Sequence, residues 1–171
     1  MNAIFLDIDY VLNGANTKER IQGIPGIEDD KVALLKQLIN PDDTIIVLTS
    51  NWRYHWNKDL GIKDISKWPE NEKENYGRYI NMKLAKQGLT VSDKTDNIYW
   101  SYRAIEIKEW LAKHTIEHFV ILDDEDFNWE RQGLIKHWVN TSEMNDDYWD
   151  EGLTQYHIEK AKKILCKGET T

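Results

Sequence analysis

The sequence predicts an α/β fold in which a parallel β-sheet is covered by helices on both faces. Two observations support this prediction. Short apolar runs bounded by turn residues alternate with stretches of helical periodicity, and three of the four apolar runs end in acidic or hydroxyl residues. At 171 residues the chain is long enough for one domain with a sizeable core, so we expect a single domain over residues 1–171.

Four apolar runs are the predicted strands of this sheet. Each run has the length of an ordinary strand and is bounded by turn signals. The runs are Ala3–Ile8, Thr44–Leu48, His118–Leu122 and Leu134–Val139.

Three stretches of helical periodicity lie between and after the strands. The first follows the acidic residues 28–30, which favour the start of a helix, the second extends from about Arg103 to His114, and the third is amphipathic. Their apolar stripes contain Val32, Leu34, Leu35, Leu38 and Ile39, then Ile105, Ile107, Trp110 and Leu111, and finally Leu153, Ile158, Ala161, Ile164 and Leu165.

Residues 52–100 form a less regular segment. We expect a helix after Asn51, a second helix around Asn75–Gln87 and a short strand near Leu89–Val91. The segment is large enough for a small lid-like insertion but not for an independent domain.

Charge and composition exclude several classes of protein. The net charge of −8 gives no broad attraction to nucleic acid or to anionic membranes, and no apolar stretch has bilayer length. The single cysteine, Cys166, excludes an intramolecular disulfide and favours a reducing compartment, and the first strand begins too close to Met1 for a signal peptide. We therefore expect a cytoplasmic monomer or weak dimer that binds neither membranes nor long duplexes.

Polar side chains follow three of the predicted strands. In a parallel sheet these strand ends meet at one edge, where carboxylates from two strands could hold a hard cation such as Mg²⁺. A cation would also explain why two acids two positions apart are tolerated after the first strand, unless the chain turns so that they diverge. The strand-end residues are Asp7 and Asp9, Thr49 and Ser50, and Asp123 and Asp124.

Each of these clusters alone has a simpler explanation. An Asp after a strand is usually a turn former or a helix cap, and Thr49-Ser50-Asn51 has the pattern of an N-cap. The ordered combination of the three clusters is what indicates a site.

The motifs resemble those of the haloacid dehalogenase (HAD) superfamily, which consists mainly of phosphatases and phosphotransferases. "DIDYVLN", "VLTSNWR" and "ILDDEDF" resemble its first, second and fourth motifs, and Arg103 in "RAIEIKEWLAKH" stands at the third, with Lys108 as the nearest alternative. The closer similarity is to the small branch related to Swiss Army knife RNA-repair proteins, whose motifs read like "LDIDGVLN", "SSWR", "RGEEIQAWL", "ILDD" and "GLT". Gly152–Thr154 matches the last of these. The resemblance implies a Rossmann-like fold without a large cap domain.

Two positions depart from the pattern. Tyr10 stands where a Gly is usual, and it could crowd the entrance of the site or stack on a substrate. Arg103 stands where the wider superfamily usually has Lys, but the Swiss Army knife branch also has Arg at this position.

The resemblance also implies the roles of the site residues. Asp7 would be the nucleophile that forms an aspartyl-phosphate, and Asp9 would protonate the leaving oxygen and then activate water. Asp7, the Asp9 backbone carbonyl and Asp123 would bind Mg²⁺, and Asp124 would act through water or replace Asp123 as the direct ligand.

The remaining candidates would contact the substrate. Thr49, or alternatively Ser50, would hydrogen-bond the phosphoryl group, and Arg103 would offset its charge. Asn51, Arg53 and Tyr10 are further candidates, although Arg53 could equally be a solvated residue at a helix start.

Trp52 and Trp56 lie one helical turn apart. They could stack on a base, but a shared buried face is the simpler interpretation.

The expected substrate is a nucleotide or a phosphorylated nucleic-acid end. A phosphatase for sugar phosphates, a HAD-fold binding protein without activity and a metal-dependent nuclease are the alternatives. The acidic stretch "SEMNDDYWDE", residues 142–151, should lie on the same edge as the site and would repel a polyanion. The resemblance further implies that the first strand is central, between those ending at Thr49 and Leu122, with Leu134–Val139 beyond the latter.

Overall fold

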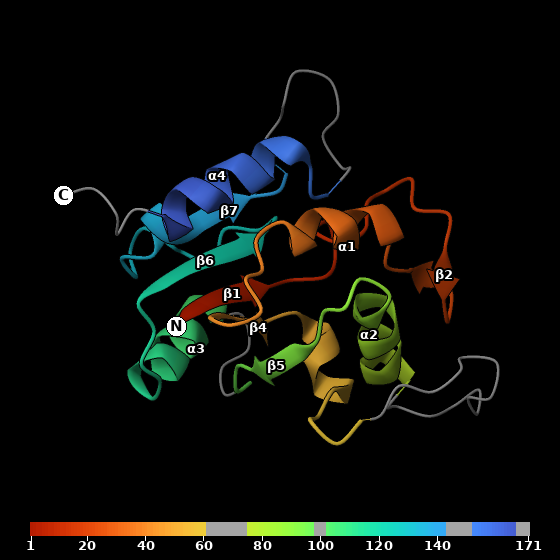
Figure 1. Ribbon diagram of the computed structural model, residues 1–171, viewed down its shortest axis with the longest axis horizontal. Coiled ribbons are helices and arrows are strands. Elements are labelled where there is room, and N and C mark those ends of the chain that lie inside the picture. Colours follow the sequence, from red (N-terminus) through yellow and green to blue (C-terminus); the bar gives the residue numbers. More distant parts are fainter. Residues whose placement is uncertain (61–74, 98–101, 143–151, 167–171) are drawn as a thin grey trace.

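The computed structural model describes residues 1–60, 75–97, 102–142 and 152–166. A twisted sheet runs through the middle of the molecule and carries helices on both faces (Figure 1). This arrangement confirms the predicted α/β fold class. No helix in the described part of the chain is both long enough and apolar enough to cross a membrane.

The main sheet has five parallel strands in the order β5-β4-β1-β6-β7. The predicted order is therefore confirmed, with the first strand at the centre. The strands are β1 (Asn2–Leu6), β4 (Thr44–Leu48), β5 (Val91–Lys94), β6 (His118–Asp123) and β7 (Trp138–Asn140). A separate two-stranded hairpin consists of β2 (Arg20–Ile21) and β3 (Ile24–Pro25).

Four α-helices and two 3₁₀ helices complete the described structure. Three of the α-helices correspond to the three predicted stripes, and the fourth corresponds to the helix expected around Asn75–Gln87. They are α1 (Asp29–Lys36), α2 (Asn75–Ala85), α3 (Arg103–Ala112) and α4 (Gln155–Leu165), with 3₁₀ helices η1 (Asn51–His55) and η3 (Ile135–His137).

The two faces of the sheet have separate cores. On β1, Ile4 and Leu6 pack with residues of α1, α2 and α4, whereas Ala3 and Phe5 pack with α3 and with Trp129. Alternating side chains of a strand point to opposite faces, so a continuous apolar run fills both cores at once. This burial is what fixes the position of the strand ends and of the polar residues that follow them.

The predicted boundaries of two strands were wrong. The run Leu134–Val139 is not one strand, because His137 N donates to Leu134 O (2.9 Å) and closes the η3 turn, which leaves Ile135 exposed. The strand predicted near Leu89–Val91 begins only at Val91. Leu89 instead ends the turn after α2, where its N–H donates to Leu84 O (3.1 Å).

The first strand is shorter than predicted, since β1 ends at Leu6. The helix predicted after Asn51 is the short 3₁₀ helix η1. The acidic stretch 142–151 lies outside the described residues except for Ser142, and so do residues 61–74 and 98–101 of the irregular segment.

Candidate active site

Three of the predicted acids converge at the carboxyl edge of the sheet. Asp7 follows β1, Asp123 is the last residue of β6, and Asp124 comes next. Each offers a carboxylate oxygen, and these oxygens all lie within 4.8 Å of one another. Oxygen ligands in this number suit a hard divalent cation, so the three residues could hold a metal ion.

Arg103 bridges two of these acids from the first position of α3. Its Nη1 lies 3.1 Å from Asp7 Oδ2 and also forms a short contact with Asp123 Oδ2. The guanidinium carbon sits 4.3 Å from the centre of the Phe127 ring, which covers the cation. By contrast, Lys108 is exposed and donates to Gln132 Oε1 (3.4 Å), so the structure brings Arg103 rather than Lys108 to the acids.

The charges at this edge are strongly coupled. Burial lowers the pKa of Arg103, but Asp7 and Asp123 more than offset it and hold that pKa above its ordinary value. Burial and the charge of Asp7 raise the pKa of Asp123 well above its ordinary value, and the same two causes raise the pKa of Asp124 to about 6. Three carboxyl groups face one guanidinium here, and a bound cation would relieve the burial and repulsion that raise these pKa values.

A turn after β1 separates Asp9 from Asp7. Asp7 N still donates to Leu122 O (3.0 Å), but the N–H groups of Val11 and Leu12 both donate to Ile8 O (3.2 and 2.8 Å). The chain thus leaves the strand direction at Ile8. The sequence raised the question of how two acids two positions apart are tolerated. In the structure Arg103 pairs with Asp7, and the chain turns before Asp9.

Side chains from two segments hold the Asp9 carboxylate. Trp52 Nε1 donates to Oδ2 (3.0 Å), and Asn13 Nδ2 donates to Oδ1 (3.3 Å). Burial raises the pKa of Asp9, the Asn13 hydrogen bond lowers it, and the charge of Asp7 raises it again, with a net increase. A carboxyl with a raised pKa keeps its proton to higher pH, as a proton donor requires.

Tyr10 occupies the tightest point of the turn. Its φ is +52°, in the left-handed region that favours glycine, which explains why a Gly is usual at this position in the resembling motif. Its N–H donates to Asn13 Oδ1 (2.7 Å), its carbonyl accepts from Thr141 Oγ1 (2.8 Å), and its side chain is exposed.

The hydroxyls of Thr49 and Ser50 differ in their contacts. Ser50 Oγ accepts from Trp52 N (3.3 Å) and so caps η1. The buried Thr49 Oγ1 has no hydrogen-bond partner among the described residues. The serine hydroxyl is thus committed to the helix start, whereas the threonine hydroxyl is not.

Arg53 points into the protein and not toward the strand-end acids. Its Nη2 lies 2.8 Å from Glu106 Oε2, both side chains are almost fully buried, and its Nη1 donates to the carbonyls of Thr49 and Ser50 (3.1 Å to Ser50). Arg53 is therefore not the solvated residue that was one of its two interpretations. Arg53 instead ties η1, and with it the strand end at Thr49, to α3.

The two tryptophans share a buried face, as the simpler interpretation predicted. Trp52 is 5% exposed and Trp56 is 3% exposed, and Trp56 Nε1 donates to Asn81 Oδ1 (2.9 Å). Asn51, in contrast, is exposed at the start of η1.

Reasoning from the sequence missed three residues that shape the site. Asn13 orients Asp9, and Glu106 anchors Arg53. At Gly152 (φ +71°) an added Cβ would lie 2.3 Å from Asn13 O. All three had a sequence signal: Asn13 closes the "DIDYVLN" motif, Glu106 lies one helical turn after Arg103, and Gly152 opens the "GLT" motif.

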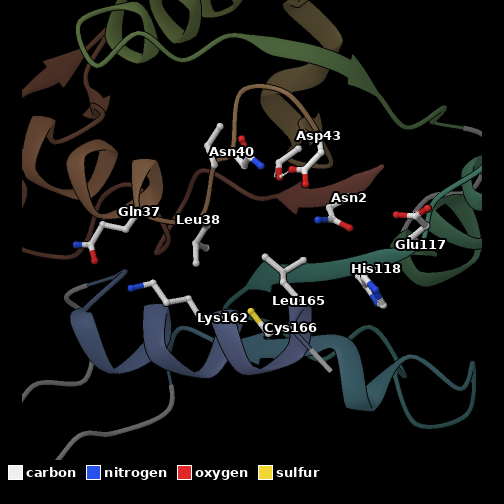
Figure 2. Close-up of a pocket in the computed structure, with 12 residues that line it drawn as sticks. Asn2, Gln37, Leu38, Asn40, Asp43, Glu117, His118, Lys162, Leu165 and Cys166 are labelled. Carbon is white, nitrogen blue, oxygen red and sulfur yellow. Dashed lines mark hydrogen bonds between the residues drawn. The ribbon is translucent and has the colours of Figure 1, made fainter. Parts of the chain in front are cut away.

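Two hollows lie at opposite edges of the sheet. One of about 300 Å³ adjoins Asp9 and Trp52. The other, of about 460 Å³, lies at the amino ends of the strands, where Asn2, Asp43 and His118 face Lys162 and neighbouring residues of α4 (Figure 2). The larger hollow includes none of the strand-end acids in its lining, so size does not identify the site here.

The comparisons with known proteins agree with this geometry. Residues 3–158 match the family described as the HAD domain in Swiss Army Knife RNA repair proteins. The search of curated proteins and the search of solved structures found no match. Because the match covers the motifs at the strand ends and most of the chain, this protein belongs to the family of HAD domains found in Swiss Army Knife RNA repair proteins.

Proposed function

We propose that the protein is a Mg²⁺-dependent phosphatase that works through an aspartyl-phosphate and acts on nucleotides or phosphorylated nucleic-acid ends. The observation that carries the proposal is that the two acids of the first motif, Asp7 and Asp9, have different contacts. Arg103 pairs with Asp7, whereas Trp52 and Asn13 donate hydrogen bonds to the carboxylate of Asp9. One carboxylate thus faces a fixed cation, which suits a nucleophile, and the other has a raised pKa, as a proton donor requires.

In the first half-reaction an oxygen of Asp7 attacks the phosphorus of the monoester. The bond between phosphorus and the leaving oxygen breaks, and Asp9 gives its proton to that oxygen. Arg103 remains beside Asp7 and stabilises the negative charge that spreads over the phosphoryl oxygens. The free hydroxyl of Thr49 is the group we assign to hydrogen-bond one of these oxygens.

In the second half-reaction Asp9, now deprotonated, takes a proton from water. The water oxygen attacks the phosphorus, the bond to Asp7 breaks, and inorganic phosphate leaves with the Asp7 carboxylate restored. Asp7, Asp123 and Asp124 are the side chains that would hold Mg²⁺, together with the Asp9 carbonyl that the family resemblance implies. The bound ion would supply positive charge that offsets the charge of the phosphoryl group.

The substrate assignment rests on the family and on the charge. Family members are described as domains of RNA repair proteins, which supports a nucleotide or a nucleic-acid end. The net charge of −8 disfavours a long polyanion. The single cysteine, Cys166, is exposed and free, which supports a location in the cytoplasm.

A phosphate-release panel tests the proposal. The panel contains 5′- and 3′-phosphorylated oligonucleotides, mononucleotides, ribose 5-phosphate and p-nitrophenyl phosphate, each with Mg²⁺ or with EDTA. We expect Mg²⁺-dependent release that is fastest from the nucleotides or oligonucleotide ends and is lost in Asp7→Asn. Preference for ribose 5-phosphate would contradict the substrate assignment, and undiminished release by Asp7→Asn would contradict the mechanism.

A further inference from the structure

The hollow beside Asp9 has walls of a distinct chemical character. Asp9 lines it together with apolar and aromatic side chains, namely Ile24, Trp52, Tyr54, His55 and Tyr76. Its volume of about 300 Å³ is at the lower end of the range for small-molecule sites, which suits one base with its sugar rather than a run of nucleotides.

The aromatic walls are held in place before any ligand arrives. The ring centre of Tyr76 lies 5.2 Å from that of Trp52 and 5.3 Å from that of His55. Helix α2 packs directly against η1, and at Gly77 an added Cβ would lie only 2.2 Å from His55 O. The rings of Trp52, His55 and Tyr76 therefore form one preorganised surface.

Part of this surface is apolar and open to solvent. Tyr54 is 50% exposed and Ile24, on the β2–β3 hairpin, is 37% exposed. The exposed amide of Asn51 lines the same hollow and offers one donor and one acceptor. An apolar, ring-lined wall with a few polar groups is the usual composition of a site for a flat heteroaromatic ligand.

The place of the hollow relative to Asp9 determines which part of a substrate would reach it. Under the proposed function, on which this inference rests, Asp9 protonates the leaving oxygen, so the leaving group lies on the Asp9 side of the phosphoryl group. We infer that the hollow binds the nucleobase of a leaving nucleoside. Tyr54 is then the residue that makes the enzyme prefer nucleotides to sugar phosphates, although both are phosphate monoesters.

The test compares two substrates in matched variants. Tyr54→Ala should lower kcat/KM for adenosine monophosphate about fivefold or more, because one stacking contact is lost, and should leave ribose 5-phosphate nearly unchanged. Tyr54→Phe should behave like the wild type because it keeps the ring. Tyr156→Ala is the control, since Tyr156 is also partly exposed (39%) but lies on α4, away from the hollow.

A binding measurement separates this inference from the proposed function. This measurement uses calorimetric titration in the Asp7→Asn background with Mg²⁺ present. Tyr54→Ala should raise the Kd for adenosine monophosphate by a similar factor and should leave the Kd for ribose 5-phosphate unchanged. If Tyr54→Ala is an active phosphatase whose ratio of kcat/KM between the two substrates is unchanged, the assignment of the hollow is overturned and the proposed function is not. Failure to release phosphate from every monoester would overturn the proposed function, and the binding ratio would then decide the assignment of the hollow by itself.

Discussion

One guanidinium nitrogen, Nη1 of Arg103, contacts both Asp7, which follows β1, and Asp123, the last residue of β6. The same cation thus neutralises the carboxylate proposed as nucleophile and a carboxylate proposed as metal ligand. This arrangement holds the two strand ends at a fixed separation. It also keeps positive charge next to the position that a phosphoryl group would occupy.

Replacing Arg103 should therefore be far more damaging than replacing the nearest alternative cation of the same helix. We expect Arg103→Ala to lower kcat for p-nitrophenyl phosphate by roughly 10²- to 10³-fold, because stabilisation of the transferring group is lost. Lys108→Ala, whose side chain is exposed, should stay within about twofold of the wild type. Steady-state kinetics on the two purified variants measures both losses of kcat. A larger loss in Lys108→Ala than in Arg103→Ala would mean that Lys108 is the residue of the third motif.

The response to Mg²⁺ should depend on pH because the pKa of Asp124 is raised to about 6. A carboxyl whose pKa is higher in the folded than in the unfolded protein destabilises the metal-free fold above pH 6, and this effect is relieved as the pH falls through 6. Since the metal binds the deprotonated carboxylate, the rise in Tm caused by Mg²⁺ should be large at pH 7.5 and small at pH 5.

Thermal unfolding with Mg²⁺ or EDTA at the two pH values measures this effect. Asp124→Asn should raise the Tm of the metal-free protein at pH 7.5 and should reduce the rise caused by Mg²⁺. Glu130→Gln, at an exposed acid, is the control. An Mg²⁺ effect of equal size at both pH values in the wild type would contradict the assignment of Asp124 to the metal site.

The buried pair Arg53–Glu106 should act on stability rather than on substrate binding. Glu106→Gln removes the charge that faces a buried guanidinium, and breaking a buried pair in this way costs about 3 to 5 kcal/mol. Lys113→Met breaks the exposed pair Lys113–Asp96, which should cost at most about 1 kcal/mol. Chemical denaturation measures both values.

Kinetics on Arg53→Lys separates the two roles considered for this residue. If Arg53 positions η1 against α3, its replacement lowers the free energy of unfolding and changes kcat more than KM. A variant of wild-type stability with a strongly raised KM would instead indicate direct contact with the substrate.

Gly152 should be needed for the geometry of the first motif. Gly152→Ala and Gly88→Ala both place a Cβ at similar positive φ (+71° and +73°), so both carry the same backbone penalty of roughly 1 kcal/mol. Only at Gly152 does the Cβ meet backbone, 2.3 Å from Asn13 O, whereas nothing lies within 4 Å at Gly88. We expect Gly152→Ala to lose more stability and to lower kcat, because Asn13 orients Asp9. Equal effects of the two substitutions would contradict this role.

The sequence was a good guide to the strands and to the residues that follow them. Apolar runs identify buried strands, and the family resemblance predicted both the central position of β1 and the meeting of Asp7, Asp123 and Arg103. These features follow from local pattern and from the family resemblance, and the structure confirms the strand order.

The contacts that orient the site could not be read from the sequence in the same way. Asp9 is held by Trp52, 43 positions away, and Arg53 by Glu106, 53 positions away. The direction of each side chain depends on how η1 packs against α2 and α3, and periodicity within one segment carries no information about that packing. The ring-lined hollow arises from the same packing, so its shape could not be predicted from the sequence either.

The central claim is a covalent phosphoryl group on Asp7, and burst kinetics with Asp9→Asn test it most directly. The p-nitrophenolate leaving group needs no proton, so this variant should complete the first half-reaction but lack the base for the second. Rapid mixing with p-nitrophenyl phosphate and Mg²⁺ should release about one equivalent of p-nitrophenolate per protein, followed by a slow steady state. Mass spectrometry after acid quenching should then find the phosphate on Asp7. Linear product release without a burst, together with an unmodified Asp7 in a protein whose wild-type form hydrolyses the ester, would contradict the account.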